Sequence, residues 1–399
     1  MRPRYALILA EAISAIGSQV SLIAVPLVAV LLLNASPFEM GVIKFCDTIP
    51  VVLFGIAAGI TIDKANKRNI MAFINFLNGL AILLIPFFLG IKILTIEILA
   101  LIIFVSSGLS SIERIGLFSL VPELVDDIAI PTTNSQLELV VSLSWIIGPS
   151  LAGILMGVWG LSNAVLFDAA TFLASAYIIC KIKYKHKNDQ HKPALSLKER
   201  LSIVNGVFKE RSSIRTVVLV AVWINFVGSI FYSLQAIFVV RDLGITPKYF
   251  SFALAAGGIG SAVGSIFAPK IHKKLGIMSL LKLSVLLFSI SILGISGLFG
   301  SLPFEEWSFG GLSALDGIGA ALINVAFITH IQEQSPDDVL GQLMGSLETL
   351  MGGAMPVGAL LGGVVASYLG VRETLFVVSL GFIVLIFPLY FQKNAVFDH

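Results

Sequence analysis

Long apolar segments recur along the whole chain and constrain its fold more than any other feature. There are twelve of them, and each has roughly the 20 residues that cross the hydrocarbon core of a bilayer as a helix. None shows the strict alternation of a transmembrane barrel strand, so helices are the only spanning structure left. We therefore predict an all-α polytopic membrane protein. The approximate spans are 5–33, 40–62, 69–90, 96–120, 135–157, 162–182, 215–240, 249–269, 277–300, 308–330, 341–367 and 372–391.

The composition agrees with this prediction. Of the 399 residues, 57% are hydrophobic and only 13% are charged, whereas charged residues make up about 25% of soluble proteins. A net charge of +2 gives no reason to expect a nucleic-acid partner. Cys46 and Cys180 both lie in apolar runs and form neither a disulfide framework nor a Cys-x-x-Cys pair. Soluble enzymes, secreted disulfide-bonded domains and disordered regulators are thereby excluded.

The positions of Lys and Arg predict the orientation in the membrane. If the N-terminus is cytoplasmic, twenty of the 26 Lys and Arg residues belong to inner segments and four to outer loops, with Lys44 and Lys282 inside spans. Cytoplasmic loops of membrane proteins carry such an excess of positive charge. Both termini are therefore predicted to be cytoplasmic.

The longest hydrophilic segment divides the twelve spans into two sets of six. It is basic and begins KYKHKNDQHKPALSLKER. We predict an N-terminal six-helix bundle over residues 1–182, a cytoplasmic basic linker over 183–214 and a C-terminal six-helix bundle over 215–399.

Matching features in the two halves predict that the six-helix unit is duplicated. The cations of the loop over residues 64–68 have the same spacing as those over 270–274. A Gly-Pro element in the fifth span, Gly148-Pro149, has a counterpart over residues 355–358 in the eleventh. Internal repeats of this kind are common in transporters.

The loop after the second span reads Gly59-Ile-Thr-Ile-Asp63-Lys64-Ala-Asn-Lys67-Arg68, which resembles the G-x-x-x-D-R/K-x-G-R/K-R/K motif of the major facilitator superfamily. Asn66 replaces the usual Gly, and Asn also tolerates a positive φ. Gly148-Pro149 is similar to the antiporter motif of drug-efflux members. Residues 16–26 and 120–125 resemble the branch of macrolide-efflux proteins and the enterobactin exporter. The resemblance covers essentially the whole chain and implies twelve transmembrane helices in two pseudo-symmetric bundles.

Candidate gating residues lie after the second span and in the fifth. Asp63 could accept hydrogen bonds from the positive N-terminus of the eleventh span, and Lys67 could pair with Glu123 or Glu113. By this hypothesis the cluster latches the outward-open state, although its cations could instead only fix the topology. The Gly-Pro pair predicts a bend and a close helix contact. The gating set is Gly59, Asp63, Lys64, Lys67, Arg68, Gly148 and Pro149.

Ionisable residues inside the spans are costly to insert and are functional candidates by default. The resemblance implies that spans one, four, seven and ten line a central cavity, with spans three, six, nine and twelve outside it. A carboxylate there could take up a proton from one side and release it on the other, with Glu11 as first candidate, Asp316 as second and Arg114 resetting them. The alternative is a set of fixed ion pairs. The coupling set is Glu11, Glu113, Arg114, Glu138, Asp316 and Glu348.

Polar and aromatic residues of the same spans are candidate substrate contacts. Aromatic side chains of transmembrane helices more often pack or face lipid, which is the alternative interpretation. The substrate set is Gln19, Ser107, Asn225, Phe231, Tyr232, Gln235 and Asn324.

Together these patterns predict an alternating-access secondary transporter that couples proton entry to the export of an amphipathic drug or siderophore. Transport of a lipid, a lysolipid or a metal-containing substrate by the same fold is the alternative. An intramembrane enzyme or a receptor is disfavoured, because the chain has no HExxH, GxSxG or nucleotide-binding loop. We expect a monomer in the lipid bilayer of a bacterial inner membrane, energised by the proton gradient, with a small-molecule substrate and no cofactor, metal site or nucleic-acid partner.

Overall fold

The computed structural model describes residues 3–62, 66–183, 199, 202, 205–208, 211–299, 304–334 and 337–391, and none of these lies in a β-strand. The predicted all-α class is therefore confirmed. Two short elements, η1 (Asp127–Ala129) and the π-helix η2 (Phe238–Asp242), accompany the long helices. The long helices are α1 (Pro3–Leu31), α2 (Pro37–Ile62), α3 (Lys67–Gly90), α4 (Ile96–Leu124), α5 (Ile130–Cys180), α7 (Ser212–Ile237), α8 (Pro247–Ser296), α9 (Glu305–Gln334), α10 (Asp337–Leu369) and α11 (Val371–Phe391).

Two of these helices each contain two of the predicted spans. Gly160 divides α5 with φ 81° and ψ 167°, and Gly276 divides α8 with φ 74° and ψ 173°. Only glycine adopts this backbone conformation readily, so the chain can bend sharply at both positions without a loop. Counted on either side of these kinks, the described residues form twelve long helical runs, as predicted. Eight of the described helices are long and apolar enough to cross a membrane.

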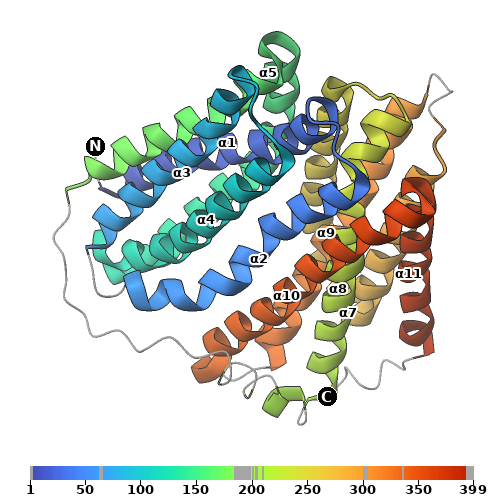
Figure 1. The fold of residues 1–399 in the computed structure, drawn as a ribbon. Helices are drawn as coiled ribbons and strands as arrows, with labels where there is room; N and C mark the ends of the chain where they lie inside the picture. The colour runs from blue at the N-terminus through green and yellow to red at the C-terminus, as the bar shows by residue number, and fades with distance from the viewer. Residues whose placement is uncertain are drawn as a thin grey trace. The chain divides into compact units, whose positions relative to one another are not determined.

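The chain forms two compact units. The first comprises Met1–Ala35 and Cys46–Leu195, so the start of α2 groups with the other unit. Within the first unit α1 packs against α5, and α3 packs against α4 and α5 (Figure 1). A buried apolar cluster from α1, α3, α4 and α5 holds these helices together. Its members include Leu7, Ala10, Met71, Leu117, Leu120, Leu137 and Ile179.

The second unit comprises Ser36–Phe45 and Ser196–His399. Here α8 packs along α9 and α11, and α7 packs against α10 and α11 (Figure 1). Glycines allow the closest approaches: a Cβ added to Gly260 would lie 2.1 Å from the carbonyl oxygen of Ala314, and one added to Gly358 would lie 2.2 Å from that of Phe226. Small residues at helix contacts are how membrane bundles pack without a hydrophobic driving force.

Some of the predicted features lie outside the described residues. Asp63 and Lys64 of the gating set are among them, as is most of the linker predicted over residues 183–214.

Candidate functional site

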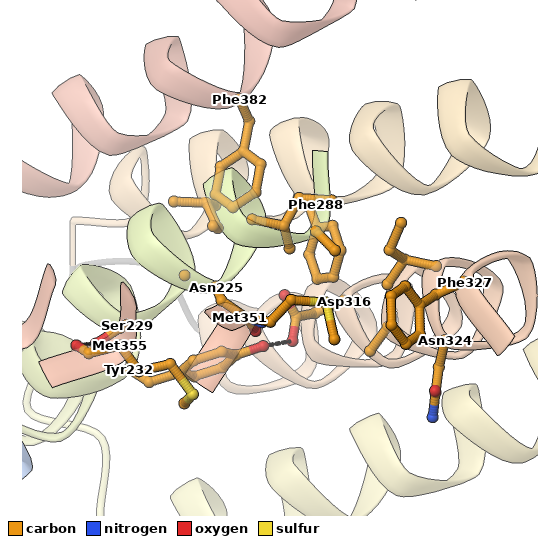
Figure 2. A pocket seen from close by; sticks show the side chains of 16 residues that line it. Asn225, Ser229, Tyr232, Phe288, Asp316, Asn324, Phe327, Met351, Met355 and Phe382 are labelled. Carbon is orange, nitrogen blue, oxygen red and sulfur yellow. Dashed lines mark hydrogen bonds between the residues drawn. The ribbon is translucent and has the colours of Figure 1, made fainter. Parts of the chain in front are cut away.

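A cavity of about 290 Å³ lies inside the second unit (Figure 2). It is lined by α7 and α9, with further side chains from α8, α10 and α11. Ligand pockets in proteins commonly measure about 300–1,000 Å³ and combine apolar walls with a few polar groups. This cavity is just below that range and fits one ring-sized part of a molecule.

Asp316 of α9 and Tyr232 of α7 form the polar side of the cavity. The Tyr232 hydroxyl donates to Oδ2 of Asp316 at 2.7 Å, which is the dashed line between them in Figure 2. Oδ1 of the same carboxylate is buried and accepts no hydrogen bond from any described residue. Leaving a buried acceptor unsatisfied costs about 1–3 kcal/mol, and more for a charged group. One oxygen of Asp316 thus has no hydrogen-bond donor among the described residues, although the side chain lies in the lining of the cavity.

Most of the remaining lining is apolar and adaptable, with Asn225, Ser229 and Asn324 as its other polar residues. The rings of Phe288 and Phe382 are stacked with their centroids 5.4 Å apart, and Phe327 lines the cavity from α9. Met351 and Met355 of α10 add unbranched thioether side chains, which adjust to differently shaped neighbours. The cavity can therefore hold an apolar body next to a carboxylate.

Three residues of the predicted substrate set line this cavity together with Asp316: Asn225, Tyr232 and Asn324. Two others from the seventh span do not line it. Phe231 is buried and makes an edge-to-face contact with the Tyr232 ring, at 5.2 Å between centroids, and Gln235 is buried one turn beyond. The candidates Gln19 and Ser107 belong to the first unit, where Ser107 donates to Asp47 at 2.9 Å.

The lining of this pocket also includes spans nine and twelve, which the resemblance places outside the central cavity. Phe288 and Ile292 from the ninth span and Phe382 from the twelfth line it. Because α8 packs against α9 and α11 packs against α7, these large side chains reach the pocket. Ser229, Met351 and Met355 also line the cavity but were not predicted to do so. Of these three, only Ser229 could have been found in the sequence, because it is a polar residue inside a span. Its hydroxyl donates to the carbonyl oxygen of Met355.

The first unit contains a group of carboxylates of its own. Glu113 of α4 is buried, and its Oε1 accepts a 2.6 Å hydrogen bond from Nδ2 of Asn75 on α3. Glu11 and Asp168 act on Glu113 electrostatically. Asp168 of α5 is also buried, and its Oδ1 accepts a 3.3 Å hydrogen bond from Thr171. Helices α1, α4 and α5 thus each contribute an acid to the same region of the first unit.

Glu11 of α1 is within electrostatic reach of two exposed charges of the same unit, Arg114 and Glu138. The structure therefore brings four members of the predicted coupling set into one unit: Glu11, Glu113, Arg114 and Glu138. Asp316 and Glu348 belong to the second unit, and Glu348 is exposed on α10 without lining the cavity. No group of three or more His, Cys, Asp or Glu side chains within the described residues could hold a metal ion.

Four members of the gating set have contacts within the first unit, whereas Gly59 is described only as part of α2. Lys67 forms an ion pair with Glu123, the first of the two partners proposed for it. Arg68 donates to the carbonyl of Ile182 at 2.9 Å. Gly148 faces α1, where a Cβ on it would lie 2.2 Å from that of Gln19, and Pro149 beside it is buried. The cluster ties α3 to α4 and to the end of α5.

A family model described as transmembrane secretion effector matches residues 4–399. The chain belongs to the major facilitator superfamily. It is 21% identical to the staphyloferrin A transporter of Staphylococcus aureus over 354 residues, which are 88% of this chain and 87% of that protein. It is 20% identical to macrolide efflux protein A of Streptococcus pyogenes over 344 residues, 85% of this chain and 84% of the relative.

The fold is also that of a solved major facilitator structure. The nucleoside transporter NupG superposes with a TM-score of 0.76 at 13% identity, over 100% of both chains. The predicted superfamily, its efflux branch and the two-bundle architecture are therefore confirmed. The protein is a multi-pass membrane transporter and not an enzyme.

Proposed function

We propose that the protein exports an amphipathic small molecule across a bacterial inner membrane by alternating access, driven by the proton gradient. The observation that carries this proposal is the cavity of the second unit, in which the Asp316 carboxylate faces apolar walls that include Phe288 and Phe382. Amphipathic ligands match such a lining. Relatives named staphyloferrin A transporter and macrolide efflux protein A support this proposal.

Proton coupling is supported by the acids of the first unit. Glu113 is buried between α3 and α4, and Glu11 and Asp168 act on it. Ionisable groups at membrane depth are costly and mark proton relays in transporters. Glu11 and Glu113 are the carboxylates that we assign to the coupling proton, with Arg114 as the nearby positive charge that resets Glu11.

The Lys67–Glu123 ion pair supports a gating role for the loop between the second and third spans. We assign this loop to the cytoplasmic side, with both termini, because most Lys and Arg residues fall on the same side. The protein acts as a monomer in this proposal, since each chain carries both the acids of the first unit and the cavity of the second.

Flux measurements in proteoliposomes test the proposal. Purified protein is reconstituted, a pH gradient is imposed, and transport is followed for a panel of macrolides, siderophores and lysolipids. Amphipathic drugs or siderophores should move against the proton flux, and collapse of the gradient with a protonophore should stop net accumulation. Accumulation that persists without the gradient would contradict proton coupling. Transport of lysolipids alone would show that the substrate is a lipid and not an amphipathic drug or siderophore.

A further inference from the structure

The carboxylate of Asp316 has one oxygen in a hydrogen bond and one unsatisfied. The Tyr232 hydroxyl donates to Oδ2 at 2.7 Å. Oδ1 is buried and has no hydrogen-bond donor among the described residues. The Asp316–Tyr232 pair thus places a carboxylate with one unsatisfied oxygen in the wall of the cavity (Figure 2).

The described lining of the cavity supplies no positive charge. Its sixteen residues include one acid, Asp316, and none of them is Lys, Arg or His. Attraction between opposite charges is stronger in apolar surroundings than in water. A hydrogen bond from a charged donor to a carboxylate is also stronger than one between neutral groups. A ligand that carries a cationic N–H donor therefore gains the most from this carboxylate.

The apolar part of the lining indicates what the rest of the ligand is like, beyond its cationic group. Phe288, Phe327 and Phe382 give the cavity aromatic surface, and Met351 and Met355 make its lining adaptable. Aromatic faces also attract cations. A volume of about 290 Å³ admits the amine-bearing end of a molecule together with one adjoining ring or alkyl segment.

We propose that Asp316 binds the protonated amine of an amphipathic substrate, so that the cavity selects amines over uncharged molecules of the same shape. This proposal rests on the proposed export function and gives the substrate class. It also moves Asp316 out of the coupling set, where the sequence placed it, and leaves the coupling proton to the carboxylates of the first unit.

Two fluorescent probes that differ in one group test the selectivity. Monodansylcadaverine carries a primary amine that is protonated at pH 7, and its N-acetyl derivative has the same dansyl ring and chain without the charge. Dissociation constants are measured by fluorescence with the full-length protein in detergent. The wild type should bind the amine about 10- to 100-fold more tightly than the amide, as expected for a hydrogen bond between charged groups. Equal affinities in the wild type would overturn the proposal.

Asp316→Asn removes the charge but keeps the shape and an acceptor for Tyr232. Its amine-to-amide ratio should fall close to one while amide binding stays unchanged, and Asp316→Glu should restore part of the preference. Glu306→Gln is the matched control, because Glu306 lies on the same helix about 15 Å away and does not line the cavity. An unchanged ratio in Asp316→Asn, or an equal loss of both probes, would reject the assignment.

Transport of the uncharged probe separates this proposal from the proposed function. In proteoliposomes with a pH gradient, Asp316→Asn should still accumulate the N-acetyl derivative at saturating concentration, because coupling is intact. Loss of that flux with retained binding would make Asp316 a coupling group and overturn the proposal. Failure of the wild type to move either probe with the gradient would count against the export function, while the binding ratio would still decide the role of Asp316.

Discussion

Lys67 and Glu123 form an ion pair between α3 and α4 in which only 3% and 4% of the two side chains are exposed. Lys67 also donates to the carbonyl oxygen of Ser119 at 3.3 Å, one turn earlier on α4. Two charges removed from water in this way stabilise a structure only when both are present, because each compensates the desolvation of the other. The two side chains therefore act as a unit.

Removing one partner of this pair should be more harmful than removing both. Lys67→Met or Glu123→Leu alone should lower the free energy of unfolding by about 3–5 kcal/mol, since each leaves a buried charge uncompensated. The double variant should lose much less than the sum of the two. Unfolding in mixed micelles, followed by intrinsic fluorescence, measures all three. Additive losses would show that the ion pair contributes no coupling energy to the fold.

Replacing Glu11 by Gln should uncouple transport from the proton gradient. The amide cannot bind and release a proton, yet it preserves the shape of the side chain beside Arg114 and Glu138. Gradient-driven accumulation should disappear, whereas substrate binding and exchange at equal pH on both sides should persist. Glu113→Gln should behave in the same way, because the amide oxygen can still accept from Asn75. Gradient-driven flux at the wild-type rate in both variants would refute the assignment of coupling to these acids.

The sequence was sufficient to predict the helices, because spans of about 20 apolar residues leave no other structure in lipid. It could not predict which helix faces meet. Asn75 and Asn78 of α3 illustrate this: they hydrogen-bond Glu113, Ser106 and Ser110 of α4. The sequence does not show whether an uncharged Asn inside a span contacts another helix or lines a cavity. The partners of these two residues also lie about 30 residues away in the chain. Both residues were absent from the sequence predictions for this reason.

The cavity was predictable only in part. Asn225, Tyr232, Asp316 and Asn324 are polar residues in spans seven and ten, and polarity at membrane depth is itself a signal. Phe288 has no such signal, because most aromatic residues of transmembrane helices pack or face lipid. Only the packing of α8 against α9 and α11 places it in the lining of the cavity.

Adding a methyl group at Gly148 should disturb the contact between α5 and α1. A Cβ at this position would lie 2.2 Å from Cβ of Gln19, so Gly148→Ala forces the two helices apart. Overpacking of this kind costs about 1–3 kcal/mol. Gly157→Ala is the matched control on the same helix, where the added Cβ meets nothing within 4 Å and the higher helix propensity of Ala should be neutral or stabilising. Thermal unfolding in detergent compares the two, and equal midpoints would contradict the close contact.

Arg372 at the start of α11 should stabilise one end of the second unit through two aromatic rings. Its guanidinium lies 5.1 Å from the centroid of Phe238 in η2 and 4.6 Å from that of Phe299, and it donates to the carbonyl of Ser296 at 2.9 Å. Cation–π and charged hydrogen-bond contributions predict that Arg372→Gln loses about 1–3 kcal/mol.

Arg372→Lys should recover only part of that loss, because an ammonium keeps the charge but cannot stack as a planar group on both rings. Hydrogen exchange of the η2 amides is the informative measurement, since loosening should begin where Phe238 loses its partner. Lys248→Gln removes a charge from an exposed side chain at the start of α8 and should leave that exchange unchanged. Full recovery by Lys would show that net charge alone, and not stacking, holds this end of the unit.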